Sequence, residues 1–367
     1  MALIDSVVMT SAGLVISSGG SEATVSWRWM RDHGEDEASF DPTTSQRRVY
    51  AINAQPPQPG LDAQLSLVNG TAVVAVTWPE APLQTWISQH TLTALLAPTP
   101  VTSPALWHHA EDSSTTKGDV TAVVNTNEPL AAWVSDIARF GFGILGGFAG
   151  GHSEVDALAS RIGYVKSTIF GTTWDLASDV DHHDDTAYSQ SFLAPHTDGT
   201  YMHDAPGLQM FCCTERDGTG GESVIVDGFA IAETLRNDHP DDFEVLTRVS
   251  VPGHYIEPGV ELRTSRPAIR LDESGAVIQI SMNNYDRSPM HLPPVEMDTF
   301  YRSYGRLHDL ANDRSRWKSI RLEVGDVLIN DNWRVLHGRE AYTGRRHFVG
   351  CYLGHEDLES RMRTLGL

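Results

Sequence analysis

The feature that most constrains the fold of this chain is a pair of possible metal ligands, His196 and Asp198, followed far downstream by His337. Two imidazoles and one carboxylate form the facial ligand set of mononuclear non-haem iron(II) enzymes. His196 and Asp198 share one side of an extended strand end, because side chains alternate along such a backbone. The fold must bring His337 to them from a distant strand. A site of this kind leaves positions open for a co-substrate and oxygen, and indicates an oxygenase.

The surroundings of these ligands favour a sheet with an anion-binding end. The pair stands just before an apolar run at 207–213, and a strand-like run at 324–330 leads toward His337. Ser223 follows two glycines that permit close backbone approach, and its hydroxyl could bond a carboxylate. Arg346 begins another strand-like segment, where its guanidinium suits a bidentate grip on a dicarboxylate.

The composition excludes several other classes of protein. A chain of 367 residues that is 40% hydrophobic can form one large domain and a smaller one. Its formal charge of −21 at pH 7 would repel a phosphate backbone, so we expect no nucleic-acid partner. The three cysteines lie in apolar runs, which is typical of reduced core residues in a cytoplasmic protein. The chain has no basic and apolar leader and no apolar run of about eighteen residues, so we expect neither secretion nor a membrane span.

The hydrophobic pattern predicts a mainly β fold in two domains. Residues 1–97 alternate in strand fashion and predict a small β-rich N-terminal domain. Residues 98–119 have the composition of a linker, in which we expect Trp107 at the surface. Residues 120–367 combine recurrent strands with metal ligands at strand ends. This pattern favours a double-stranded β-helix, or jelly-roll, catalytic domain with flanking helices.

Helices are expected at four points of the larger domain. Apolar residues repeat with helical spacing from Leu130 to Ile137, and the run from Ser153 to Asp156 resembles a capping box for the next helix. Further helices are expected near 229–237 and 295–311. The glycines at 141–146 match a dinucleotide fingerprint, but no acid follows about twenty residues on, so we expect no nucleotide site there.

With these residues in place, the segment from about 130 to 367 resembles the γ-butyrobetaine and trimethyllysine dioxygenase family of TauD-like iron(II)/2-oxoglutarate oxygenases. The matching stretches lie at 170–174, 187–188, 196–198, 206–209, 219–223, 226–229, 283–284, 331–339 and 346–347. The resemblance implies that His196, Asp198 and His337 hold iron(II). It also implies that Arg346, with Ser223, binds the distal carboxylate of the co-substrate 2-oxoglutarate. Arg345 is the alternative arginine.

The resemblance also implies a substrate site. In butyrobetaine hydroxylases an aromatic cage holds a trimethylammonium group, which cation–π attraction explains. The residues that match the cage are Phe170, Trp174, Tyr188 and Tyr352. Simple core packing is an alternative for Phe170. Asn284 and Arg287 could bind the anionic end of the substrate.

Two departures from the family pattern matter. Relatives often carry a cysteine-rich zinc site in the N-terminal domain near residues 27–33, but no cysteine follows here, so we expect no zinc. Asp185 stands where butyrobetaine enzymes have an asparagine that contacts the substrate carboxylate. An aspartate there would repel a carboxylate unless one of them carries a proton, which a phosphonate could bring. The substrate could therefore be 2-trimethylaminoethylphosphonate rather than γ-butyrobetaine, which would place the chain in that branch of the family.

We therefore expect an iron(II)- and 2-oxoglutarate-dependent hydroxylase of a small trimethylammonium zwitterion. Its partners would be a small-molecule substrate and O2, and the resemblance implies a homodimer. Hydroxylation of trimethyllysine or another amine is an alternative within the family. A non-catalytic jelly-roll sensor that binds metal and 2-oxoglutarate is an alternative of a different class.

Overall fold

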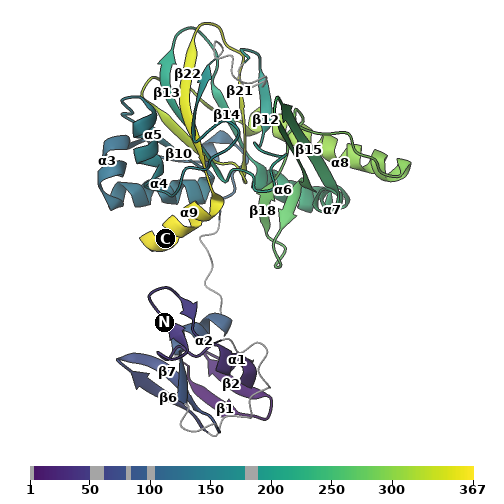
Figure 1. Ribbon diagram of the computed structural model, residues 1–367. Coiled ribbons are helices and arrows are strands. Elements are labelled where there is room, and N and C mark those ends of the chain that lie inside the picture. Colours follow the sequence, from purple (N-terminus) through teal and green to yellow (C-terminus); the bar gives the residue numbers. More distant parts are fainter. Residues whose placement is uncertain (1–3, 50–61, 80–83, 97–103, 178–188) are drawn as a thin grey trace. The chain divides into compact units, whose positions relative to one another are not determined.

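A computed structural model describes residues 4–49, 62–79, 84–96, 104–177 and 189–367 (Figure 1). The chain forms two compact units, Met1–Val101 and Thr102–Leu367. Asp185 and Tyr188, two of the residues expected in the substrate site, lie outside the described residues. In the part of the chain that is described, no helix has both the length and the apolar character needed to cross a membrane.

The described residues of the first unit form small antiparallel sheets and two short helices. One sheet has the order β1-β2-β3, a second has the order β6-β7-β8, and β4 pairs with β5. The bounds are β1 Ser6–Met9, β2 Gly13–Ser18, β3 Ser21–Ser26, β4 Phe40–Asp41, β5 Gln46–Arg47, β6 Asp62–Val68, β7 Thr71–Thr77, β8 Gln84–Ser88, α1 Trp27–Asp32 and α2 Gln89–Leu96. Trp27 and Trp78 meet edge to face in the core of this unit, with ring centroids 6.0 Å apart.

The second unit is built on two sheets that face each other. The larger has the order β11-β22-β13-β20-β10-β9 and the smaller the order β12-β21-β14-β19. The bounds are β9 Gly118–Asp119, β10 Phe142–Gly146, β11 Thr173–Ala177, β12 Leu193–His196, β13 Leu208–Arg216, β14 Ser223–Asp227, β19 Lys318–Ile320, β20 Val327–Asp331, β21 Val335–Arg339 and β22 Arg346–Leu353. Leu328 and Phe348 from the larger sheet pack with Ile225 and Val335 from the smaller, so one apolar core fills the space between them.

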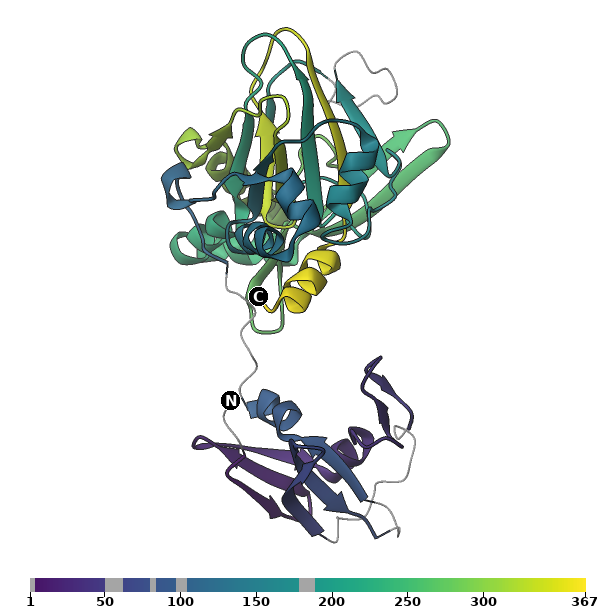
Figure 2. The same cartoon turned by 90° about the vertical axis from the view of Figure 1, so that its left-hand side faces the viewer.

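Helices cover the outer faces of both sheets. One group packs on the larger sheet and a second group packs on the smaller, and the two groups lie on opposite sides in Figure 1 and can be followed in Figure 2. The first group is α3 Val120–Asn125, α4 Asn127–Phe140, α5 His152–Ala159 and α9 His355–Leu365. The second is α6 Gly228–Asp238, α7 Pro240–Arg248 and α8 Pro294–Asn312. Two hairpins complete the unit, β15 Ser250–Glu257 with β16 Val260–Pro267 and β17 Ile269–Leu271 with β18 Val277–Ile280.

A buried ion pair fixes the turn that leads into β21. Arg334 Nη2 lies 2.7 Å from Asp227 Oδ2, and both side chains are almost wholly buried. Asp227 also caps α6, and Arg334 donates to the carbonyls of Ala105 and Arg139. Since each side-chain nitrogen of Arg334 and each side-chain oxygen of Asp227 has a hydrogen-bond partner, the turn is held firmly, and with it the start of the strand that carries His337.

The sequence-based expectations for individual elements had mixed outcomes. The helices at α4, α6 and α8 are confirmed, and α7 was not expected. The capping box at Ser153 is wrong: Gly151 is the N-cap, and Glu154 instead accepts hydrogen bonds from the backbone of Ala149 and Gly150. The expectation of a mainly β chain understated the helices, because the fold is mixed α/β with more strand than helix.

Trp107 corrects a second expectation. We placed it at the surface of a linker, but the side chain is 1% exposed, and its Nε1 donates to the carbonyl of Phe140 at 2.9 Å. A tryptophan surrounded by loop-forming residues was mistaken for a surface residue, whereas its ring closes one end of the core between the sheets. The three cysteines are free and buried, as expected.

Candidate metal and co-substrate site

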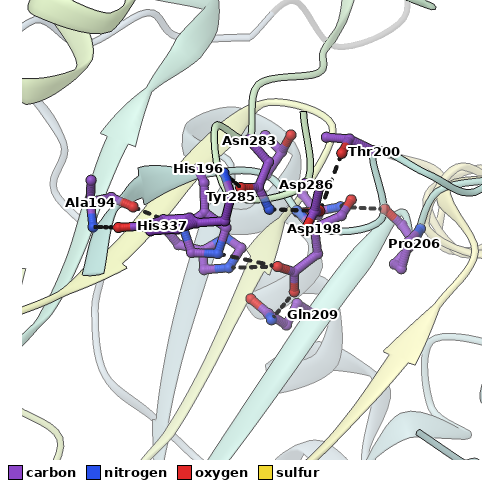
Figure 3. A network of polar contacts seen from close by, with 12 residues as sticks. Ala194, His196, Asp198, Thr200, Pro206, Gln209, Asn283, Tyr285, Asp286 and His337 are labelled. Carbon is purple, nitrogen blue, oxygen red and sulfur yellow. Dashed lines mark hydrogen bonds and ion pairs between the residues drawn. The ribbon is translucent and has the colours of Figure 1, made fainter. Parts of the chain in front are cut away.

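His196, Asp198 and His337 converge at one end of the space between the sheets. His196 ends β12 and is the direct partner of His337 on β21 in the strand register. The Nε2 atoms of both rings lie 3.4 Å from the same oxygen, Oδ1 of Asp198 (Figure 3). The three candidate ligand atoms all lie within 4.8 Å of one another. Three donors directed at one point from two imidazoles and one carboxylate suit an octahedral iron(II).

Other side chains orient the candidate ligands. Nδ1 of His196 lies 2.8 Å from the carbonyl oxygen of Ala194, so Nε2 is left for a metal. The backbone N–H of Asp198 donates to Asn332 Oδ1 at 2.8 Å, and Asn332 returns a bond to the carbonyl of Asp198. Oδ2 of Asp198 accepts from the Tyr352 hydroxyl at 2.7 Å and from Gln209 Nε2. Because Oδ2 is used in this way, Oδ1 is the oxygen that remains for a metal.

The electrostatics keep the carboxylate ionised. Burial alone would raise the pKa of Asp198, but His337 and His196 outweigh it and hold that pKa well below its usual range. Burial lowers the pKa of His337, which favours the neutral imidazole that binds metals. The donor set therefore fits a divalent cation.

A buried arginine lies in the same cavity. Arg346, the first residue of β22, is 9% exposed, and its Nη2 lies 3.4 Å from Ser223 Oγ. Among the described residues no carboxylate forms an ion pair with it, and burial together with nearby Arg339 lowers its pKa to about 9. An uncompensated buried guanidinium is unfavourable, so this position fits a ligand that brings negative charge. Arg345 is instead exposed and paired with Glu215 at 3.4 Å.

An aromatic wall lines the cavity beside the triad. Trp174 lies between Phe211 and Tyr352, with ring centroids 5.4 Å away in both cases. Phe170, Tyr201 and Tyr285 also line the cavity, and only the first of these was expected. The neighbouring strand permits this arrangement: a Cβ on Gly350 would stand 2.1 Å from the Trp174 ring.

The predicted anion-binding residues are placed differently. Asn284 is exposed and accepts from Arg287 Nε at 3.2 Å, and neither side chain lines the cavity. Their neighbours Asn283 and Asp286 do line it. Asp286 Oδ2 accepts from Asn283 Nδ2 at 2.8 Å and from Thr200 Oγ1 at 3.2 Å (Figure 3).

Several residues of the site were not singled out from the sequence. Gln209 and Asn332 stand inside two of the matching stretches, so their motif was noticed but their role in holding Asp198 was not. Tyr285 and Asp286 directly follow a third stretch. Their approach to the triad depends on how the loop before α8 crosses the sheet, which a local pattern does not reveal.

Comparisons with known proteins agree with this geometry. Residues 102–352 match the family described as "Taurine catabolism dioxygenase TauD, TfdA family". Trimethyllysine dioxygenase of Meyerozyma guilliermondii is 36% identical over 249 residues, covering 65% of this chain and 61% of that protein. The mitochondrial trimethyllysine dioxygenase of Homo sapiens is 29% identical over a match that covers 92% of this chain and 82% of that protein. The gamma-butyrobetaine dioxygenase of Homo sapiens is 32% identical over a match that covers 67% of this chain and 66% of that protein. The chain thus spans less than two thirds of the length of the Meyerozyma guilliermondii protein.

Solved structures share the fold at low identity. A putative alpha-ketoglutarate-dependent taurine dioxygenase from Burkholderia xenovorans superposes with a TM-score of 0.52 at 12% identity, covering 68% of this chain and 91% of that one. A taurine dioxygenase from the same organism gives 0.51 at 16% identity, covering 68% and 89%.

Proposed function

Because this chain belongs to the TauD/TfdA family of iron(II)- and 2-oxoglutarate-dependent dioxygenases, we propose that it hydroxylates a small trimethylammonium compound. The observation that carries the proposal is one cavity that combines the His196, Asp198 and His337 donors, the buried Arg346 and an aromatic wall. A sensor needs the metal site and the arginine, but not an aromatic wall suited to a cationic substrate.

The two facing sheets of the larger unit support a double-stranded β-helix, with His196 and His337 on adjacent strands of the smaller sheet. We propose that residues 1–97 are a small N-terminal domain and residues 120–367 the catalytic domain, and the two compact units divide between them, at Val101 and Thr102. The homodimer and the cytoplasmic location stay predictions.

The residues of the chain have separate tasks in the proposed reaction. Iron(II) with 2-oxoglutarate and oxygen would supply the oxidation of a substrate C–H bond. Arg346 and Ser223 would hold the distal carboxylate of 2-oxoglutarate by charge-assisted hydrogen bonds. Gln209 and Tyr352 keep Asp198 in one orientation. Trp174, Phe170 and the other rings would bind the cation and exclude water, so that the C–H bond is held near the metal.

Three trimethylammonium compounds are candidates. γ-Butyrobetaine and 2-trimethylaminoethylphosphonate differ at the anionic end, and the case for the phosphonate rests on Asp185. Trimethyllysine is the second candidate function, and Asp286 favours it: a carboxylate in the cavity wall can pair with the α-ammonium group that this amino acid carries and the other two compounds lack.

One assay tests these alternatives. Purified protein with iron(II), 2-oxoglutarate and oxygen is given each compound in turn, and succinate and hydroxylated product are both measured. We expect substrate-stimulated succinate formation with at least one of the three. Tight 2-oxoglutarate binding without product from any compound would favour the sensor.

Two variants then separate the candidates. Asp185→Asn should improve use of γ-butyrobetaine relative to its phosphonate analogue, because it removes an anion that only a protonatable partner tolerates. Asp286→Asn should impair hydroxylation of trimethyllysine more than hydroxylation of the other two compounds. An unchanged preference ratio in the first variant would remove the main support for the phosphonate.

A further inference from the structure

His337 has a buried ring nitrogen without a hydrogen-bond partner. Its Nε2 faces Asp198, so the proton of the neutral imidazole belongs on Nδ1. That Nδ1 is buried and makes no hydrogen bond within the described part of the chain, whereas Nδ1 of His196 has the carbonyl of Ala194 at 2.8 Å. Metal-bound histidines ordinarily donate this proton to a fixed acceptor, which sets the tautomer and the orientation of the ring. The candidate iron site is therefore supported on its His196 side and lacks a partner on its His337 side.

Asn330 presents the complementary deficit. Its side chain is 0% exposed, and neither Oδ1 nor Nδ2 has a hydrogen-bond partner among the residues that the structure describes. A buried carboxamide that bonds nothing is unfavourable in a fold whose other buried polar groups are largely paired. Its position on β20 is thus expected to serve a purpose other than packing.

The strand pattern directs both side chains into the same space. On β20, Val327 and Ile329 pack under the outer helices, while Leu328 packs between the sheets, so Asn330 points between the sheets as well. On β21, Val335 belongs to that same inner core, and His337 follows it by two residues. Asn330 and His337 both line the cavity, and only residues 332–334 separate the two strands.

Gln209 is the other candidate acceptor. It is the register partner of Asn330 on β13, and its Oε1 is also buried without a hydrogen bond. Its Nε2, however, bonds Oδ2 of Asp198, and this contact fixes the direction of the amide. Among the described residues the carboxamide of Asn330 has no hydrogen bond, so no contact fixes which way its oxygen faces.

We propose that Asn330 is a positioning residue for the metal site, whose Oδ1 accepts the hydrogen bond from Nδ1–H of metal-bound His337. This inference rests on the proposed function, since it assumes that Nε2 of His337 binds the metal. It adds a side chain that touches neither metal nor substrate but fixes the ring of a ligand.

The test measures metal binding without co-substrate or substrate. Mn(II), as an air-stable probe of the iron site, is titrated by calorimetry into the wild type, Asn330→Leu and Asn330→Asp. We expect Asn330→Leu to raise the Kd for Mn(II) roughly 10- to 100-fold, as loss of such outer partners usually does. Asn330→Asp keeps an acceptor oxygen and should bind close to the wild type. Wild-type affinity in Asn330→Leu, or equal weakness in both variants, would overturn the proposal.

Controls separate this result from unfolding and from failure of the site itself. Asn312→Leu makes the same replacement at the end of α8, outside the cavity, and should leave the Kd unchanged. Thermal unfolding in the presence of a chelator checks that the variants are folded. If the wild type binds no Mn(II) and has no succinate-forming activity, the proposed function fails rather than this inference.

A second measurement does not depend on replacing Asn330 by leucine. In the zinc-loaded wild type labelled with 15N-histidine, the Nδ1–H of His337 should give a slowly exchanging proton signal that is absent from His337→Ala and displaced in Asn330→Asp. A rapidly exchanging signal, or one that Asn330→Asp leaves in place, would contradict the hydrogen bond. A raised KM for a substrate in Asn330→Leu, with unchanged Mn(II) affinity, would assign the side chain to ligand binding instead.

Discussion

The hydroxyl of Tyr352 donates a 2.7 Å hydrogen bond to Oδ2 of Asp198, the carboxylate whose other oxygen faces the two histidines. Tyr352 therefore connects the aromatic wall with the candidate metal site. The same ring stands 5.4 Å from that of Trp174, so one side chain contributes to both places. Burial and the adjacent Asp198 raise its pKa well above the ordinary value, which keeps the hydroxyl protonated as a donor.

Tyr352→Phe should consequently affect the metal more than the substrate cation. The variant keeps the ring but loses a hydrogen bond to a charged group, which is worth about 1.5–3 kcal/mol. We expect a higher Kd for Mn(II) by calorimetry and a small change in the KM of the trimethylammonium substrate. The reverse pattern would mean that the hydroxyl contacts the substrate and that its bond to Asp198 is incidental.

Removing any one metal ligand should abolish turnover. In His196→Ala, Asp198→Ala and His337→Ala only two of the three donors remain, and among the described residues no other trio of candidate ligands converges on one point. Product formation and Mn(II) binding should both disappear, while circular dichroism shows a folded protein. Substantial activity in two of these variants would refute the metal assignment.

Arg346→Ala should raise the KM for 2-oxoglutarate. The variant removes a charge-assisted bidentate contact worth about 2–3 kcal/mol, which corresponds to a roughly 30- to 150-fold increase. Arg345→Ala is a matched control, because that side chain is exposed and paired with Glu215. The assay compares 2-oxoglutarate and iron(II) requirements in both variants. An effect confined to Arg345→Ala would show that the neighbouring arginine binds the co-substrate.

The candidate metal ligands could be predicted because short sequence motifs contain them. A His-x-Asp pair and a later histidine can be recognised without knowing the fold. Arg346 was selected because a guanidinium at a strand start suits a bidentate grip on a dicarboxylate and because its segment resembles the family. The helix at α4 was predictable for a similar reason, since its apolar side chains repeat with a period that only a helix uses on one face.

Other features depend on contacts between distant segments. The sequence around Trp107 resembles a loop, and only the Phe140 carbonyl and the inner core explain why the ring is buried. Asn330 follows an apolar run, and its sequence context alone does not distinguish it from a polar residue at the end of a strand. Asn284 was selected within a family motif, but the turn of the loop exposes it and directs Asn283 and Asp286 to the cavity instead.

The thiols should be unreactive in the folded protein and should make its stability depend on pH. Burial raises the pKa of Cys213 to about 11 and that of Cys351 to about 12. In the unfolded chain thiols ionise near pH 8.5, so above that pH the unfolded state loses protons that the folded state keeps. The free energy of unfolding should then fall as pH rises.

Urea unfolding at pH 7.5 and pH 9.5 measures this fall, and Cys351→Ala should show a smaller one. At the lower pH a maleimide should label the protein only after denaturant is added. Rapid labelling of the native protein would mean that at least one thiol is accessible.

In the aromatic wall, the position of the Trp174 ring can be tested separately from its presence. Trp174→Leu removes the ring, and we expect it to weaken binding of a trimethylammonium substrate by about 1–2 kcal/mol. Gly350→Ala keeps the ring but places a methyl group where a Cβ would stand 2.1 Å from it, so the indole must move. Both variants should raise the substrate KM and leave the Kd for Mn(II) unchanged, because the Trp174 ring packs on Phe211 and Tyr352 and supplies no metal ligand. If Trp174→Leu leaves the substrate KM unaltered while Gly350→Ala raises it, the indole serves packing alone and the cation is bound elsewhere in the cavity.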